Sequence, residues 1–430
     1  MKDITKRTFL KTGLVLFSGS AALTPCGSLA ATRPALFSIL CAHRWLTADP
    51  AITLENSVVP PIAVQMAGSK QAPLIFWART NLELIKKYRI NPLRAARTLS
   101  YLMVTLHDVH GLCIEKYGSA PAQCATAMHL AAGTVVEHFF PEEIKGRWIG
   151  AGILFASQHA TRTTPDWADL WRLSQQVAQR TIAHALTDGS ARINAMAQPP
   201  GNIHLAWKAA PPLWSTRPAE PGASTWRPWL VPSAVGDRCP PPLTLDEARY
   251  AKEIQKVHHT HQHLTPQQRK IADDWNLELG TVSPPGVWLL KAIEKPAFLD
   301  LAPIEQTAAL SLLTAAMFDA FIACWYVKFT WWTERPVTAI RRLHDPGFLP
   351  HVLTPSFPSY PSGHATVSGA AASLLSNFFP QHQEEWMQAA QEASDSRLYG
   401  GIHFSFDNEE GLSLGKKVGA LAISAIMKNT

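Results

Sequence analysis

The sequence predicts an all-α protein built from two helical bundles, and two observations lead to this prediction. Segments that begin with helix-capping residues recur along the chain, whereas alternating Val, Ile and Thr stretches typical of strands are nearly absent. The 430 residues are 47% hydrophobic, so the chain can bury a large core. No short-period repeat indicates a solenoid, which leaves two bundles of similar size as the expected architecture.

Capping signals mark the starts of four expected helices. The expected helical ranges are 91–110, 164–188, 265–280 and 244–258. In the first three ranges an Asn or Thr precedes a proline, the pattern of a capped helix start. In the fourth, Thr244 and Glu247 have the spacing of a capping box, so the helix is expected to open there and run toward His258.

The chain is expected to divide into four parts. They are a signal peptide at 1–30, an N-terminal helical bundle at 31–197, a connector at 198–242 and a C-terminal helical bundle at 243–430. The connector is rich in Pro, Gly and Ser, and no regular element is predicted in it. Tryptophans are costly to leave in water, so the connector is expected to pack across the body of the protein. Its tryptophans are Trp207, Trp214, Trp226 and Trp229.

The first thirty residues have the pattern of a cleavable export signal. Basic residues precede a Gly, Ser, Ala and Leu stretch that ends at Ala30. The segment around Arg7 resembles the twin-arginine motif with Lys6 in place of the first arginine, so both that route and the general secretory route stay open. Cys26 is a weaker lipidation candidate because Pro25 precedes it. The mature protein is therefore expected in the periplasm or outside the cell.

Charge and hydropathy limit the classes of partner. The formal charge is +6, but no long Lys/Arg block is present, so nucleic-acid binding is not expected and the positive charge is predicted to surround a bound anion. The range 308–327 is apolar enough to span a bilayer. Because Asp319 lies inside it, we predict a buried bundle helix and a mature protein that does not span the membrane. A homodimer is left open.

Two cysteines leave a second question open. Cys113 and Cys124 flank a turn-rich segment at 117–121. In an oxidising compartment they form either a disulfide or two buried thiols, and sequence spacing does not decide between these alternatives.

Three short motifs in the C-terminal half supply the groups that a tetrahedral oxyanion needs. The motifs are Lys328-x6-Arg335-Pro336, Pro361-Ser362-Gly363-His364 and Ser396-Arg397-x5-His403. Guanidinium groups replace the hydration of charged oxygens with directional hydrogen bonds, so Arg335 and Arg397 are the expected forks. Lys328 adds a compact charge. The Ser362 hydroxyl and the Gly363 amide are expected to donate to an oxygen of the anion.

Two histidines and an aspartate are the candidate catalytic groups. A neutral His403 offers a nitrogen lone pair, which either attacks phosphorus or ligates vanadium. His364 is placed to act as an acid or a base. Asp407 lies four residues after His403 and is expected to accept its other ring proton if a helical turn brings them together. The alternative role for Asp407 is to stabilise the start of the helix near Glu409.

These motifs, in this order and spacing, resemble the signature of the vanadium haloperoxidases and the related acid and lipid phosphatases, the type 2 phosphatidic acid phosphatase superfamily. The stretch Gly400-Gly401-Ile402-His403-Phe404 is similar to the bacterial haloperoxidase branch. The resemblance implies vanadate bound through His403, with His364 at its apical oxygen. It implies that the remaining oxygens are held by Lys328, Arg335, Ser362, Gly363 and Arg397. It also implies hydrogen peroxide, a halide and a small organic acceptor as substrates.

The same site suits phosphate, so an acid phosphatase with a phosphohistidine on His403 is the alternative function. The haloperoxidase is favoured because compact soluble phosphatases of this superfamily lack the preceding helical half. Trp325 and Phe357 also resemble aromatic residues beside the halide region of fungal chloroperoxidases, although ordinary packing explains them equally well. Phe357 stands where bromide-specific relatives place a histidine, so the halide is not assigned.

Two further hypotheses, one about function and one about a metal site, are less favoured. A protein that only captures an oxyanion needs donors and charge but not His403 beside His364, so a non-catalytic binder is the minor alternative. The histidine-rich range 258–263 suggests a metal site by composition. Helical spacing scatters its rings around the axis, so a solvated helix end is the preferred interpretation.

Overall fold

The computed structural model describes residues 39–46, 72–159, 166–191, 199, 201, 203 and 205–428. Within these ranges the chain is helical, and its only β-type pairings are isolated bridges such as Ala206 with Thr333. The all-α prediction is therefore confirmed. The predicted signal peptide at 1–30 and Cys26 lie outside the described residues.

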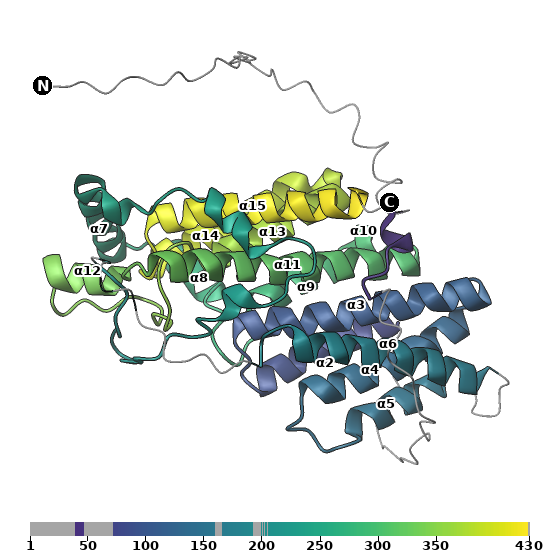
Figure 1. Ribbon diagram of the computed structural model, residues 1–430. Helices are drawn as coiled ribbons and strands as arrows, with labels where there is room; N and C mark the ends of the chain where they lie inside the picture. Colours follow the sequence, from purple (N-terminus) through teal and green to yellow (C-terminus); the bar gives the residue numbers. More distant parts are fainter. Residues whose placement is uncertain are drawn as a thin grey trace, which may run out of the picture.

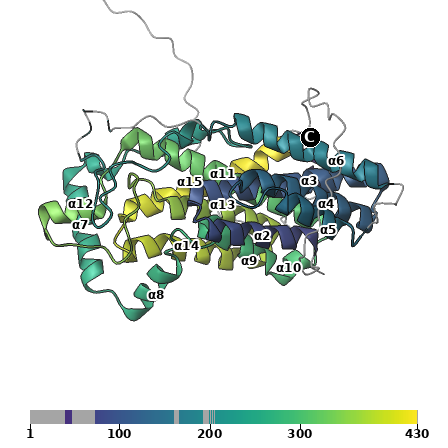
Figure 2. The ribbon, with the colours of Figure 1, turned by 90° about the horizontal axis from the view of Figure 1, so that it is seen from below.

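Five helices form an N-terminal bundle, and the longer helices of the C-terminal half form a second layer beside it (Figure 1). The N-terminal helices are α2 (Pro73–Lys87), α3 (Pro92–Tyr117), α4 (Pro121–Phe139), α5 (Arg147–Ala156) and α6 (Trp167–Thr187). The C-terminal helices are α7 (Glu247–Gln262), α8 (Pro266–Asp274), α9 (Ser283–Ile293), α10 (Pro296–Leu299), α11 (Pro303–Trp331), α12 (Pro336–Leu343), α13 (Gly363–Phe378), α14 (Gln383–Tyr399) and α15 (Ser405–Lys428). Helices α7 and α12 contact each other at one end of the molecule (Figure 2).

Helix α11 joins the two layers. It packs along α3 on one side and against α13 and α15 on the other, so one continuous hydrophobic core runs through both bundles. Its 18-residue apolar window has a mean hydropathy of 1.7, enough to cross a membrane by composition, yet that window is entirely buried. Asp319 within it is also buried. The structure therefore has the buried bundle helix that the sequence predicts.

The connector is anchored to α11 through Asp319. The carboxylate accepts hydrogen bonds from the backbone amides of Trp229, Leu230 and Val231 at 2.7–2.9 Å. Burial raises the pKa of Asp319 to about 7, while these three hydrogen bonds act in the opposite direction. Because the buried side chain satisfies these three amides, the connector packs against the core at this point without leaving them unpaired.

Two predictions about the connector are wrong in detail. It contains two short 3-10 helices, η1 (Ala223–Thr225) and η2 (Ser233–Arg238), where no regular element was predicted. Trp207 and Trp226 are buried as expected, but Trp214 is 59% exposed. Trp214 adopts a left-handed backbone with φ of 48°, in a turn where its amide bonds the carbonyl of Ala210, and this turn directs the ring into solvent.

Helix boundaries differ from the predictions where tertiary contacts intervene. Asn91 caps α3 through the amide of Arg94, but the helix continues beyond 110. Asp246, not Thr244, caps α7, because its side chain accepts the amide of Arg249 while Thr244 belongs to a 3-10 turn. The predicted Thr265 capping box is present.

Helix α8 ends at Asp274, before the predicted end at Gly280, because the next residue turns into the core. Trp275 is 4% exposed, and its carbonyl accepts a hydrogen bond from Arg397. Helix α6 ends before Asp188 as predicted. Its predicted start at 164–165 lies outside the described residues.

The two cysteines Cys113 and Cys124 are buried free thiols on the packed helices α3 and α4.

The histidine-rich range lies at the end of α7. There the rings of His259 and His263 stack at 4.2 Å between centroids. The described residues contain no group of three or more potential metal ligands. Within 258–263, His258 and His261 are half-buried and pack against Phe348, so this end of the helix is only partly solvated.

Glycines let α13 and α15 approach to backbone contact. Gly411, Gly415 and Gly419 recur every fourth residue, so they share one face of α15. A Cβ placed on Gly415 would lie 2.0 Å from the carbonyl oxygen of Thr366, and one on Gly411 would lie 2.7 Å from that of Ser362. This glycine face therefore sets the distance between the helices that carry Ser362 and Asp407.

We expect Gly415→Ala to lower the free energy of unfolding by about 1–3 kcal/mol, because the added methyl group overpacks a backbone contact that neither helix can relieve locally. Thermal melts followed by circular dichroism measure the effect. Gly201→Ala is the matched control, since a Cβ there meets no atom within 4 Å. Equal melting temperatures for the two variants would contradict this account of the glycine face.

Candidate active site

The three motifs converge where several helices begin or end. Lys328 lies in the last turn of α11, Arg335 caps α12, and Arg397 lies in the last turn of α14. All three cationic side chains are at most 1% exposed. The structure thus gathers the three predicted cations in the interior of the C-terminal bundle.

The start of α13 supplies the predicted donors. Ser362 is the N-cap, so Gly363 and His364 occupy the first turn, where backbone amides have no partner within the helix. The Ser362 amide bonds the carbonyl of Asp407 at 2.8 Å, which fixes the start of α13 against the start of α15. Because a helix N-terminus carries partial positive charge, this turn favours an anion.

His403 and Asp407 form the expected pair. His403 Nδ1 lies 2.9 Å from Asp407 Oδ2, and both side chains are buried. Asp407 also accepts the amide of Phe404 at 3.2 Å, so both roles considered for it, orienting His403 and capping the start of α15, are present. Since Nδ1–H donates a hydrogen bond to the carboxylate, the lone pair of His403 resides on Nε2.

Ser359 is a site residue that the sequence did not reveal. Its hydroxyl donates to Asp407 Oδ2 at 2.5 Å and its carbonyl accepts from Lys328 Nζ at 2.8 Å. In the sequence, the only link between Ser359 and a motif is that it lies two residues before Pro361, where the second motif begins. A serine beside prolines is a common turn residue. Lys328 Nζ also donates to the carbonyl of Pro358 at 2.8 Å.

Hydrogen bonds fix the guanidinium of Arg335 but leave one of its nitrogen atoms without a partner in the described part of the chain. Its Nε donates to the carbonyl of Phe357 at 2.8 Å, and its Nη1 donates to that of Ile402 at 2.7 Å. Nη1 also lies 3.1 Å from His403 Nε2. Its Nη2 is buried and has no partner in the structure as described. Arg335 therefore keeps a directed donor available beside the lone pair of His403.

Arg397 and His364 share a backbone anchor. Arg397 Nη2 donates to the carbonyl of Trp275 at 2.6 Å, and its Nε contacts the hydroxyl of Ser396 at 2.9 Å. The His364 ring is also hydrogen-bonded to the backbone of Trp275. His364 Nε2 is buried without a partner among the described residues. The chain therefore leaves a second polar nitrogen unsatisfied near the cations.

Burial governs the electrostatics of the site. It lowers the pKa of Lys328 to about 7, with Arg335 adding to the effect, and it lowers the pKa of both arginines. Burial, followed by the charges of the nearby cations, also lowers the pKa of His403 and of His364 well below the usual 6.5. It raises the pKa of Asp407 to about 6. A bound anion would relieve the cations, and neutral histidines are the forms that offer lone pairs.

Two aromatic rings border the cations. The ring centroids of Trp325 and Phe357 are 4.9 Å apart. Lys328 Nζ lies 5.1 Å and Arg335 Cζ 4.9 Å from the centroid of Phe357. Both rings thus lie beside the predicted site.

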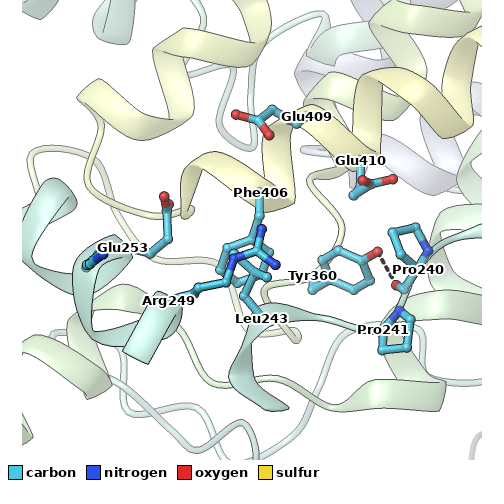
Figure 3. A pocket seen from close by; sticks show the side chains of 10 residues that line it. Pro240, Pro241, Leu243, Arg249, Glu253, Tyr360, Phe406, Glu409 and Glu410 are labelled. Carbon is cyan, nitrogen blue, oxygen red and sulfur yellow. Dashed lines mark hydrogen bonds between the residues drawn. The ribbon is translucent and has the colours of Figure 1, made fainter. Parts of the chain in front are cut away.

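The cavity in Figure 3, with a volume of about 470 Å³, is a different place. Tyr360 and Phe406 line it, and charges of both signs surround it, including Arg249, Glu409 and Glu410. None of the predicted oxyanion residues is part of its lining. Its carboxylates repel an oxyanion, so the cluster of buried cations remains the candidate site.

Part of the chain matches a family model. Residues 308–384 and 380–430 match the family model described as the VCPO second helical-bundle domain. No curated protein sequence matches the chain significantly.

Solved structures extend the likeness over most of the chain. A bacterial vanadium-dependent iodoperoxidase superposes with a TM-score of 0.70 at 23% identity, over 82% of this chain and 96% of that one. A holo-type bacterial vanadium-dependent chloroperoxidase gives 0.65 at 14% identity, over 85% and 99%. This chain therefore has the fold of the vanadium-dependent haloperoxidases, and its C-terminal bundle carries the VCPO second helical-bundle domain of that branch.

Proposed function

We propose that this protein is a vanadate-dependent haloperoxidase, which uses hydrogen peroxide to oxidise a halide to hypohalous acid. The observation that carries the proposal is a buried cluster of three cationic side chains around His403 Nε2, in which Arg335 Nη1 faces that nitrogen and Arg335 Nη2 has no partner among the described residues. The likeness to iodo- and chloroperoxidases supports it. The balanced reaction is H2O2 + X⁻ + H⁺ → HOX + H2O, where X⁻ is the halide.

The residues present fit vanadate. Arg335 Nη2 and His364 Nε2 are buried polar atoms without partners, and a partly protonated oxyanion satisfies both, because one of its oxygens accepts from Arg335 and a hydroxyl group donates to neutral His364. Lys328, Arg397 and the first turn of α13 at Ser362 and Gly363 complete the set that would hold the remaining oxygens. His403 Nε2 would ligate the metal. When bound, vanadate supplies a Lewis acid that activates peroxide toward the halide.

The protein's own residues prepare the site for the proposed reaction in three ways. Asp407 and Ser359 keep the Nδ1 proton of His403 in place, so Nε2 stays directed at the site. His364 Nε2 is positioned to deliver and accept the proton that the reaction consumes. Burial of the cluster limits the water that competes with peroxide and strengthens each charge interaction.

The N-terminal sequence supports export to the periplasm or the cell exterior as part of this proposal. Peroxide and halide are the proposed small substrates, and hypohalous acid is released or halogenates a small organic acceptor. A homodimer remains compatible with the proposal.

An acid phosphatase is the alternative, because the lone pair on His403 Nε2 also suits attack on phosphorus once a bound anion takes over the contact with Arg335. Parallel assays of metal-free protein with and without orthovanadate separate the two. We expect bromination by peroxide only with vanadate, and little hydrolysis of a chromogenic phosphate ester. Hydrolysis by the metal-free protein that vanadate inhibits would instead establish the phosphatase.

His403→Ala tests for a non-catalytic binder. We expect the variant to lose halide oxidation, because the metal loses its protein ligand, while much of the affinity for inorganic phosphate survives through the cations. Calorimetry measures phosphate binding, and peroxide-dependent bromination measures activity. Wild-type protein that binds oxyanions but shows neither activity would support the binder.

Asp407→Asn is expected to weaken vanadate binding by roughly 10- to 100-fold, since the amide no longer holds the Nδ1 proton of His403. Vanadate titration followed by calorimetry gives the dissociation constant. Asp300→Asn, at an exposed position, is the control. Unchanged vanadate affinity in Asp407→Asn would remove Asp407 from the proposed role.

Sulfate binding is expected to protonate Lys328 at pH 8, whereas at pH 6 Lys328 contributes almost no proton uptake. Burial lowers the pKa of Lys328 to about 7, so the free lysine is largely neutral at pH 8, and an anion raises its pKa again. At pH 6 it is already protonated. Calorimetry in buffers of different ionisation enthalpy measures the uptake, because sulfate itself does not titrate in this range. Lys328→Met should abolish the uptake and the exposed Lys416→Met should retain it; uptake that persists in Lys328→Met would assign it to another group.

A further inference from the structure

One connector residue joins the two aromatic side chains that border the cations. Trp325 Nε1 donates to the carbonyl of Ala219 at 3.1 Å. The amide of Ala219 donates to the carbonyl of Ser356 at 2.7 Å, immediately before Phe357. Ala219 therefore fixes the indole of Trp325 and the backbone that carries Phe357 relative to each other.

The next residue, Glu220, is anchored to the N-terminal bundle. Its carboxylate pairs with Arg94 of α3 through both oxygens, one of these contacts being 3.0 Å from Arg94 Nη2 to Glu220 Oε2. Asn91 Nδ2 donates to Glu220 Oε1 at 3.0 Å. The Glu220 side chain is 12% exposed and the Arg94 side chain is 40% exposed, so the carboxylate is the shielded side of this pair.

The backbone of Glu220 adopts an unfavourable left-handed conformation, which its side-chain contacts stabilise. Its φ is 53°, in the left-handed region that residues with a Cβ rarely occupy. Such a conformation persists where surrounding contacts enforce it. The carbonyl of Glu220 also accepts the amide of Ala223 at 2.9 Å, at the start of η1. The ion pair with Arg94 is the contact that holds the side chain in this turn.

We propose that Glu220 is a positioning residue for the halide, acting through Ala219 on Trp325 and Phe357. The proposal rests on the haloperoxidase function proposed above. Because Lys328 Nζ lies 5.8 Å from the ring of Trp325 and 5.1 Å from that of Phe357, the two rings determine how closely a small anion approaches the cations. The N-terminal bundle therefore contributes to halide affinity through α3, although it contains none of the oxyanion motifs.

A first experiment tests the link without any activity. Metal-free protein labelled with 5-fluorotryptophan gives a fluorine NMR resonance for Trp325, assigned by its loss in Trp325→Phe. We expect this resonance to shift or broaden in Glu220→Gln, which keeps the shape of the side chain but removes its charge opposite Arg94. Glu143→Gln is the matched control, because Glu143 is 3% exposed and pairs with Lys87 and Arg147 elsewhere in the same bundle. An unchanged Trp325 resonance in Glu220→Gln would overturn the proposal.

A second experiment measures the consequence for halide. In vanadate-loaded enzyme, Glu220→Gln is expected to raise the KM for the halide that the wild-type enzyme oxidises by about three- to tenfold with kcat within about twofold, because the change removes binding rather than chemistry. Trp325→Phe removes the Nε1 donor and keeps an aromatic ring. In that background Glu220→Gln should add little, since both changes break the same link.

The outcomes are distinct. Additive effects of the two substitutions, or equal loss of kcat in Glu220→Gln and Glu143→Gln, would show general destabilisation and overturn the proposal. Wild-type enzyme that fails to oxidise any halide would refute the proposed function instead, and the NMR comparison would still decide whether Glu220 positions Trp325.

Discussion

The burial of positive charge is the constraint on which the rest of the structure depends. Lys328, Arg335 and Arg397 are withdrawn from water with Asp407 as the carboxylate of the cluster. Removing a cation from water costs several kcal/mol unless fixed partners replace the hydration. Backbone carbonyls supply much of that replacement here, at Pro358, Ser359, Phe357, Ile402 and Trp275. They do not neutralise the charge, so the site is ready for an anion before one arrives.

Helix termini give this charge its fixed geometry. The cations lie at the end of α11, the start of α12 and the end of α14. Helix α13 begins directly after Ser362, and helix α15 begins two residues before Asp407. The glycine face of α15 prevents these last two helices from separating or sliding without loss of backbone contact. Positions held in this way need little rearrangement during reaction, which is the condition under which oriented donors contribute most to catalysis.

The sequence predicted those parts of the site that are encoded by side-chain type at fixed spacing. The three motifs placed Lys328, Arg335 and His403, and the four-residue interval suggested the pairing of His403 with Asp407, which the structure contains. The carbonyl acceptors were beyond prediction because every residue has one, and only the fold decides which carbonyl faces a cation. Ser359 was missed for a related reason, since a buried hydroxyl and a turn hydroxyl are identical in sequence.

The same limit explains the errors in the fold. Periodicity and capping residues located the helices, but their ends depended on tertiary contacts. Helix α8 stops at Asp274 because the carbonyl of Trp275 is required by Arg397. The exposure of Trp214 reflects the opposite case, in which a local left-handed turn outweighs the general tendency of indole rings to be buried.

The carboxylate of Asp319 ties α11 to the connector between the two bundles. It belongs to α11, yet its hydrogen-bond donors are three amides of the connector, so neither segment is satisfied without the other. A fragment that began at residue 243 would retain every oxyanion motif but would leave this acid inside α11 without its amides, and would expose the face that packs on α3. A chimera of this architecture must therefore keep α11 together with the connector backbone at 229–231 and with α3, because α11 packs against both.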